Sequence, residues 1–154
     1  MAVIFETDNF SIESADKPYV SREEGGHIYL FPKVPVRDRT QLSAPLAVEY
    51  MKLSMVVGDA LPEAMQRRGV DIGIINYQDM GNWRVFTPEG PTLHMHIYGR
   101  AKTAGIQKYG EAVQLPQRST GFYDNFKPLD EEDRKEIKKV IKKLIQTTKY
   151  QHFV

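Results

Sequence analysis

The sequence contains no cysteine in its 154 residues, which excludes disulfide bonds, thiolate nucleophiles and cysteine metal ligands. It also lacks any apolar run near the roughly 18–20 residues that a bilayer-spanning helix requires. The N-terminal stretch carries Glu6 and Asp8 early and has no basic region, so we expect no signal peptide. These absences are compatible with the cytoplasm, and we expect a cytoplasmic protein without membrane contact.

An excess of charge of one sign is missing as well. The 21 Lys and Arg residues nearly balance the 20 Asp and Glu residues, and the formal net charge is +1. This balance provides no electrostatic reason for a nucleic-acid partner, and we predict none. The length suits a single domain over residues 1–154, with a core at about 3–102 and a C-terminal loop and helix at 103–154.

Hydrophobic periodicity predicts a mixed fold. Short apolar or alternating segments predict strands at residues 3–9, 9–14, 27–33, 70–78 and 92–98. A spacing of three and four predicts a helix from about Ser43 to Arg68, with a break near Gly58–Pro62. Residues 129–150 predict a C-terminal helix, and residues 103–128 predict a long irregular segment. The order of these elements favours an antiparallel α+β domain.

Histidine is scarce, yet two of the four histidines lie one residue apart in "GPTLHMHIYGRAK". Side chains alternate between the two faces of a strand. One face would therefore carry Thr92, His94, His96 and Tyr98, and the other Leu93, Met95 and Ile97. The two imidazoles are predicted to lie side by side.

Three interpretations of this pair stay open from the residues alone. The two side chains could be partly buried strand residues that hydrogen-bond to neighbours. They could supply two ligands to a metal, although a catalytic zinc usually takes three protein ligands and no spacing identifies the third. They could also serve nucleophilic catalysis at phosphorus, because a neutral imidazole attacks at physiological pH and a second one donates a hydrogen bond.

Several segments resemble the histidine triad (HIT) family. "LHMHIYGR" resembles the end of its His-φ-His-φ-His-φ-φ motif, where φ is apolar. "GGHIYLFPKVPVRDRTQL" is similar to the Gly-His segment that precedes the family's long helix, and "GIINYQ" is similar to its strand with an asparagine. These matches span about residues 3–102 in the family's order.

The resemblance implies a HIT-like antiparallel five-stranded sheet with a long helix and a C-terminal helix, often paired into a homodimer. It also implies hydrolysis or transfer at the α-phosphorus of a nucleotide substrate, a nucleoside phosphoramidate or a dinucleoside polyphosphate. Family members use no obligatory metal, and we predict no cofactor and no metal site.

The resemblance assigns roles to the histidines through their register. Counting back from Gly99 and Arg100, His94 matches the middle histidine, the nucleophile, and His96 matches the last, a phosphate hydrogen-bond donor. In the other register, Tyr98 becomes the third member and His96 the nucleophile, but Gly99 is then misplaced.

Three residues depart from the family pattern. Thr92 stands where the first histidine belongs, and its hydroxyl could keep a weaker hydrogen bond. Pro88 and Glu89 replace the Gln-Ser pair that precedes the motif, and a carboxylate there would repel a phosphate unless it points away.

Other candidate substrate-binding residues follow from the same alignment. His27 matches a histidine beside the nucleotide pocket, and Asn76 matches a phosphate-contacting asparagine. Asp16 could accept hydrogen bonds from ribose hydroxyls, and Arg100 adds a positive charge next to the site. The favoured hypothesis is an enzyme with a nucleotidyl-histidine intermediate. The alternatives are a nucleotide-binding module with little catalysis and a metalloenzyme.

Overall fold

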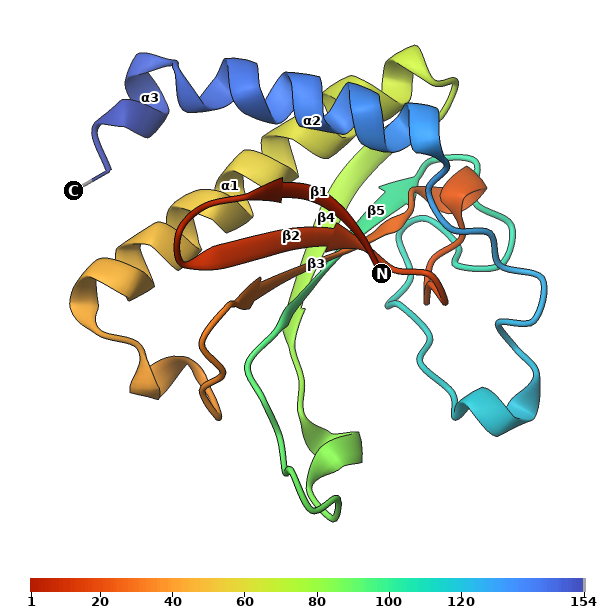
Figure 1. Cartoon of the computed structure of the whole chain (residues 1–154). Coiled ribbons are helices and arrows are strands. Elements are labelled where there is room, and N and C mark those ends of the chain that lie inside the picture. Colours follow the sequence, from red (N-terminus) through yellow and green to blue (C-terminus); the bar gives the residue numbers. More distant parts are fainter. Residues whose placement is uncertain (154) are drawn as a thin grey trace.

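The centre of the molecule is a five-stranded antiparallel sheet, seen in a computed structural model that describes residues 1–153 (Figure 1). The strands are β1 (Ala2–Glu6), β2 (Phe10–Ser14), β3 (His27–Pro32), β4 (Ile72–Asp79) and β5 (Met95–Ala101). Their order is β1-β2-β3-β5-β4, and every neighbouring pair is antiparallel. The predicted α+β class with a five-stranded antiparallel sheet is confirmed, and the histidine strand lies inside the sheet.

Helix α1 (Ala44–Arg67) packs on one face of the sheet and is continuous, so the predicted break near Gly58–Pro62 is wrong. Pro62 has no N–H and removes one backbone hydrogen bond. Burial on both sides of the proline holds the helix together, because tertiary packing supplies most of a helix's stability. The buried apolar residues are Tyr50, Leu53, Val56, Val57, Ala60, Leu61, Ala64 and Met65. No helix within residues 1–153 combines the length and apolar character needed to cross a membrane.

The C-terminal helix lies over the same face as α1 (Figure 1). It is α2 (Glu131–Ile145), and a separate short helix, α3 (Thr148–Gln151), follows instead of one helix over 129–150. The Thr147 hydroxyl donates to the Leu144 carbonyl at 2.6 Å, which helps to end α2. The predicted apolar stripe is present: Ile137, Val140 and Ile141 are buried, and Leu144 and Ile145 are partly buried.

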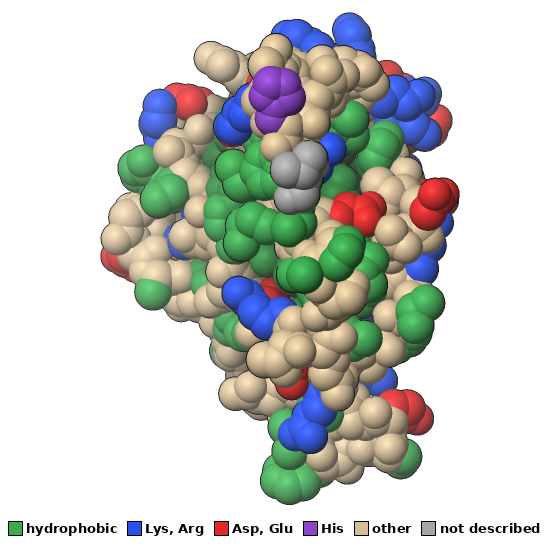
Figure 2. Space-filling view, turned by 90° about the vertical axis from the view of Figure 1, so that its left-hand side faces the viewer, with side chains coloured by type: hydrophobic (Ala, Val, Ile, Leu, Met, Phe, Trp, Pro, Cys, Tyr) green, Lys and Arg blue, Asp and Glu red, His purple; other side chains and the backbone are tan. Residues whose placement is uncertain are grey.

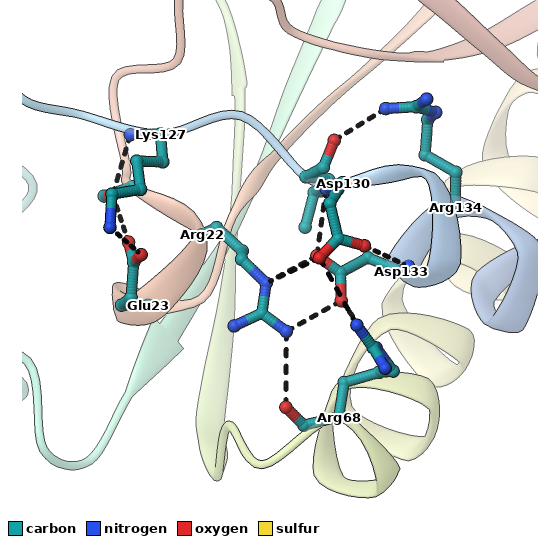
Figure 3. Close-up of polar contacts among 9 residues, drawn as sticks. Arg22, Glu23, Arg68, Lys127, Asp130, Asp133 and Arg134 are labelled. Carbon is teal, nitrogen blue, oxygen red and sulfur yellow. Dashed lines mark hydrogen bonds and ion pairs between the residues drawn. The ribbon is translucent and has the colours of Figure 1, made fainter.

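A buried carboxylate joins α2 to the rest of the domain (Figure 3). Asp133 is fully buried and accepts from Arg22 Nε at 2.6 Å and from Arg68 Nε at 2.9 Å. Asp133 and Asp130 also form a capping box at the start of α2. Arg22 begins the short 3-10 helix η1 (Arg22–Glu24), so this cluster ties three distant segments together.

The histidine strand is shifted along the chain relative to the predicted 92–98. β5 begins at Met95, so Thr92, Leu93 and His94 lie just before it. Pairing with β3 runs from His27–Tyr98 only to Leu30–Met95, and the Leu93 N–H donates instead to the Val36 carbonyl at 2.8 Å. The predicted alternation persists. Leu93, Met95 and Ile97 lie in the main core, whereas His96 and Tyr98 face the opposite side of the sheet.

Residues 103–128 cover part of that opposite side and are irregular, as predicted, apart from the 3-10 helix η4 (Arg118–Thr120). Three buried polar side chains anchor them. Glu24 accepts from the N–H groups of residues 105, 106 and 107. Arg100 donates to the carbonyls of residues 107, 108 and 111, and the Gln107 amide bonds the backbone of Tyr19 and Gln114. The segment is therefore held firmly against the sheet.

Candidate active site

Three of the four histidines lie together on the side of the sheet opposite the helices. His27 begins β3, His96 lies in β5 and His94 directly precedes β5. The ring centroids of His94 and His96 are 4.7 Å apart, and those of His27 and His96 are 5.2 Å apart. The structure thus brings together the three histidines that the sequence singled out.

The hydrogen bond of His94 determines which of its ring nitrogens is free. Nδ1 lies 2.8 Å from the Thr92 carbonyl oxygen. A carbonyl oxygen can only accept, so Nδ1 carries the proton and donates. In the neutral ring, Nε2 then keeps its lone pair, which is the form that a nucleophilic imidazole needs.

His27 and His96 form a chain with a defined direction. The Tyr19 N–H donates to Nδ1 of His27 at 3.2 Å, so the proton of neutral His27 lies on Nε2. That nitrogen is 3.0 Å from Nδ1 of His96 and donates to it. The proton of neutral His96 therefore lies on Nε2, which becomes a hydrogen-bond donor. Neighbouring imidazoles thus hold opposite roles, His94 as an acceptor or nucleophile and His96 as a donor.

Burial keeps this pair neutral. His27 is 1% exposed and His96 is 4% exposed. Desolvation, together with the electrostatic influence of the neighbouring His94, lowers the pKa of His96 to about 3. Desolvation, assisted by His96 and Arg118, lowers the pKa of His27 well below its usual value. The tautomer chain therefore stays uncharged at physiological pH.

A pocket of about 260 Å³ opens beside the histidines. Its lining residues are Tyr19, Tyr29, Met80, Gly81, Asn82, Trp83, Arg84, His94, His96 and Leu115. Tyr19 and Trp83 meet edge to face with ring centroids 5.8 Å apart. Burial raises the pKa of Tyr29 to about 12, so its hydroxyl remains a proton donor. The pocket combines aromatic walls with a small set of polar groups, as ligand sites do.

Thr92 lies on the other side of His94, in a neighbouring pocket of about 240 Å³. Arg37 and Arg39 also line that pocket. The Thr92 hydroxyl accepts from Nη1 of Arg84 at 3.1 Å, and its carbonyl holds His94. Glu89 is exposed and lines neither pocket.

Asn76 and Arg100 bond to each other away from the pocket. Arg100 is buried, and its Nη1 donates to Oδ1 of Asn76 at 2.7 Å. Its other guanidinium contacts anchor residues 107–111. Neither residue lines the pocket beside the histidines. The structure therefore gives Arg100 a positioning role for the irregular segment.

Asp16 lies in a separate pocket, with Lys17, Arg118 and Tyr123 among its lining residues. Its carboxylate also meets the N-terminal amine of Met1. Between that pocket and His96 stands Tyr19, whose ring is covered by the Arg118 guanidinium at 4.3 Å. The structure does not bring Asp16 together with the histidines.

Only His94 and His96 among the lining residues were predicted from the sequence; the missed ones include Tyr19, Tyr29, Trp83 and Arg84. Tyr29 has a usable signal, since it lies in "GGHIYLFP" two residues after His27 and thus on the same strand face. The others lie in connecting segments outside the strands and long helices, where no periodicity indicates which side chains turn inward.

Within residues 1–153, no group of three or more His, Cys, Asp or Glu side chains is arranged to hold a metal ion. A hydrogen bond joins Nε2 of His27 to Nδ1 of His96.

No family model and no curated protein matches the sequence, but solved structures do match the fold. A histidine triad nucleotide-binding protein from Sulfolobus tokodaii has a TM-score of 0.60 at 14% identity, covering 99% of this chain and 90% of that one. A zinc-bound histidine triad family protein from Mycobacterium smegmatis has a TM-score of 0.60 at 16% identity, covering 94% and 87%. A Hit-like protein from Bartonella henselae, involved in cell-cycle regulation, has a TM-score of 0.58 at 16% identity, covering 90% and 85%.

Proposed function

We propose that this chain, which has the fold of histidine triad proteins, is a nucleotide hydrolase or transferase that forms a covalent nucleotidyl-histidine at His94. The observation that carries the proposal is the bond from Nδ1 of His94 to the Thr92 carbonyl, which leaves Nε2 with a free lone pair beside the pocket. The proposed substrates are nucleoside phosphoramidates or dinucleoside polyphosphates.

The reaction takes place in two displacements at the α-phosphorus. In the first, the Nε2 lone pair of His94 forms a bond to phosphorus, and the bond to the leaving group breaks with its electron pair on that group, which takes a proton from water. In the second, water attacks the same phosphorus, loses a proton and displaces His94. Covalent catalysis replaces one difficult displacement by two easier ones. The nucleotidylated ring is positively charged, and the Thr92 carbonyl stabilises it by accepting from Nδ1–H.

His96 is proposed as the donor to a phosphate oxygen. Its Nε2–H is available because His27 donates to its other nitrogen. A donor held in place before the reaction stabilises charge as it develops, without reorganisation. His27 is then a positioning residue that fixes the tautomer of His96. The scheme requires no metal and no cofactor.

The remaining candidates take less direct parts. Thr92 holds His94 through its carbonyl, whereas Asn76 and Arg100 support β5 and the irregular segment from outside the pocket. A ribose contact with Asp16 would require the ligand to extend past Tyr19, which separates the two pockets. The rings of Tyr29 and Trp83 offer apolar surfaces for a nucleobase.

A substrate screen with trapping of the intermediate tests this proposal. Adenylated and guanylated phosphoramidates and dinucleoside polyphosphates are incubated with the wild-type protein and rapidly quenched in base, which preserves a phosphoramidate bond to histidine. Mass spectrometry should locate a nucleotidyl group on His94, and His94→Ala should abolish turnover. Retained hydrolysis by His94→Ala, or an adduct on His96, contradicts the assigned register.

The second candidate function is a nucleotide-binding module with little catalysis. It is favoured by Thr92 at the first histidine's place, since a hydroxyl is a weaker partner than an imidazole. Nucleotide binding by the wild-type protein, with no adduct at His94 and no turnover of any substrate in the screen, would support it against the enzyme.

A homodimer is proposed through the edge of β4. This strand pairs on one side only, with β5, and it exposes Ile74 and Tyr77 to 53% and 46%. An unprotected apolar edge invites pairing with a second copy. Light scattering should give twice the monomer mass, and Ile74→Lys should shift the protein to monomer. A wild-type monomer at micromolar concentration contradicts the dimer.

A further inference from the structure

The pocket lacks the phosphate partners that the sequence resemblance leads one to expect. Thr92 replaces the first histidine, and Pro88 and Glu89 replace the Gln-Ser pair. Glu89 is exposed and lines neither pocket beside His94. A reacting phosphate therefore needs another source of positive charge.

Arg84 is the one lining residue of the pocket with a permanent charge, and no carboxylate lines the pocket. Arg84 is the last residue of the 3-10 helix η3 (Asn82–Arg84) and is partly buried. None of the ion pairs formed within residues 1–153 includes Arg84. The positive charge of Arg84 is therefore not compensated by any acidic side chain that lines this pocket.

The position of Arg84 is coupled to that of His94. Nη1 of Arg84 donates to the Thr92 hydroxyl at 3.1 Å, while the Thr92 carbonyl accepts from Nδ1 of His94 at 2.8 Å. The Thr87 hydroxyl donates to the Arg84 carbonyl at 2.9 Å and closes the turn behind it. Thr92 thus links the Arg84 guanidinium to the His94 imidazole. The bond to Thr92 uses only one of the N–H donors of the guanidinium.

The loop that carries Arg84 leaves the sheet as a long arm, which forms the lowest part of the molecule in both views (Figures 1 and 2). Its tip exposes Val85 and Phe86, the latter to 99%. The edge contact of Trp83 with Tyr19 ties the arm to the pocket. Residues 80–84 of the arm line the pocket.

We propose that Arg84 binds a non-bridging oxygen of the reacting phosphate and supplies hydrogen-bond donors, together with a positive charge, in place of the missing first histidine and Gln-Ser pair. This inference rests on the proposed function, which it deepens by adding a phosphate-binding residue. A guanidinium suits the role because its planar fork of N–H donors matches phosphate oxygens and stays charged at every relevant pH. Donors aimed at a phosphoryl group in a site shielded from water are among the largest contributors to its transfer.

Equilibrium binding separates this role from catalysis. Calorimetry would compare AMP and GMP with adenosine and guanosine, on the wild-type protein and on Arg84→Met. We expect at least one monophosphate to bind the wild-type protein more tightly than its nucleoside. Arg84→Met should lose on the order of tenfold or more in monophosphate affinity, the size of a charge-assisted hydrogen bond, and little in nucleoside affinity.

Three further variants complete the test. Arg84→Lys should retain part of the monophosphate preference, because it keeps the charge without the fork. Thr92→Val, which removes the hydroxyl acceptor, should lower kcat more than it weakens monophosphate binding. Arg67→Met is the matched control: it removes the same charge from α1, where Arg67 pairs with Glu63 and Glu136, and should leave binding unchanged.

The proposal is overturned if Arg84→Met, with an unchanged melting temperature, binds the monophosphate as the wild-type protein does, or if nucleoside binding falls equally. It is also overturned if the wild-type protein shows no preference for monophosphates over nucleosides. Failure of the covalent mechanism would appear instead as turnover by His94→Ala, and it would leave the Arg84 binding result standing.

Discussion

Nε2 of His27 lies 3.0 Å from Nδ1 of His96, although 69 residues separate the two histidines in the chain. Strands β3 and β5 are neighbours in the sheet, and residue 27 pairs with residue 98, so the two rings meet diagonally across the strand pair. The Tyr19 N–H gives this bond its direction. A buried side chain outside the pocket thereby determines which nitrogen of a pocket residue carries a proton.

Replacing His27 by Phe should lower kcat/KM roughly tenfold, because the bond that fixes the His96 tautomer, about 1–1.5 kcal/mol, is lost. His27→Gln should recover part of the activity, since a side-chain amide N–H can donate to the same nitrogen. Steady-state kinetics and the ¹⁵N shifts of His96 provide the measurement. Equal activity in the Phe variant and the wild-type protein would rule out the positioning role.

Replacing His96 by Ala should slow turnover by on the order of 10²-fold, the usual cost of removing one donor to a developing oxyanion. The covalent adduct on His94 should still form, only more slowly. Rapid-quench measurement of adduct formation checks this. A complete loss of adduct in His96→Ala would instead indicate that His96 is the nucleophile.

Acid should destabilise the folded protein through the buried histidines. Burial and His94 lower the pKa of His96 to about 3, and burial lowers that of His27 in the same direction, whereas an unfolded histidine titrates near pH 6.5. The unfolded state therefore binds more protons as the pH falls below about 6.5, and stability falls with it. Urea unfolding at pH 7.5 and pH 5 measures this effect. The free energy of unfolding should fall less between the two pH values in the double variant His27→Gln, His96→Gln than in the wild-type protein. An equal loss in both proteins contradicts the assignment.

Asp133→Asn should lower the free energy of unfolding by about 3 kcal/mol, because it leaves Arg22 and Arg68 facing a neutral amide. Burial alone would raise the pKa of the Asp133 carboxyl, but hydrogen bonds from Arg22, Arg68 and the Asp130 N–H together hold the pKa below its usual value. Its stabilisation is therefore complete above the unfolded pKa of about 3.9 and disappears as the pH falls through the lower folded pKa.

The control for Asp133 is Glu132→Gln, one residue away and exposed, which should change the free energy of unfolding by less than about 0.5 kcal/mol. Chemical denaturation at pH 7 compares the two variants. If both variants change the free energy of unfolding by a similar, small amount, the ion pairs of Asp133 contribute no more than an exposed ion pair.

Replacing Pro62 by Ala should stabilise the protein, by about 1–3 kcal/mol before any lost packing, because it restores an N–H to the interior of α1 and removes the proline's clash with the preceding turn. Thermal melting checks this, with an increase in Tm expected. A decrease would show that the pyrrolidine ring contributes more to packing than the missing hydrogen bond costs.

Local patterns were sufficient for much of the fold. The α+β class, the sheet, both long helices and the irregular segment at 103–128 follow from periodicity and capping residues. The predicted break at Pro62 failed because burial of the apolar face of α1 outweighs one lost hydrogen bond. The strand at 92–98 started late because β3 and β4 offer its first residues no pairing partner.

By itself, the sequence determined that two imidazoles share one side of a strand whose other side is apolar, because alternation along a strand is a local property of the backbone. Only the tertiary structure decided what those imidazoles can do. The neighbours His27 and Arg84, the separation of Asp16 by Tyr19 and the structural use of Arg100 depend on which strands lie side by side and how loops return over them. Such contacts join residues tens of positions apart, and no local periodicity encodes them.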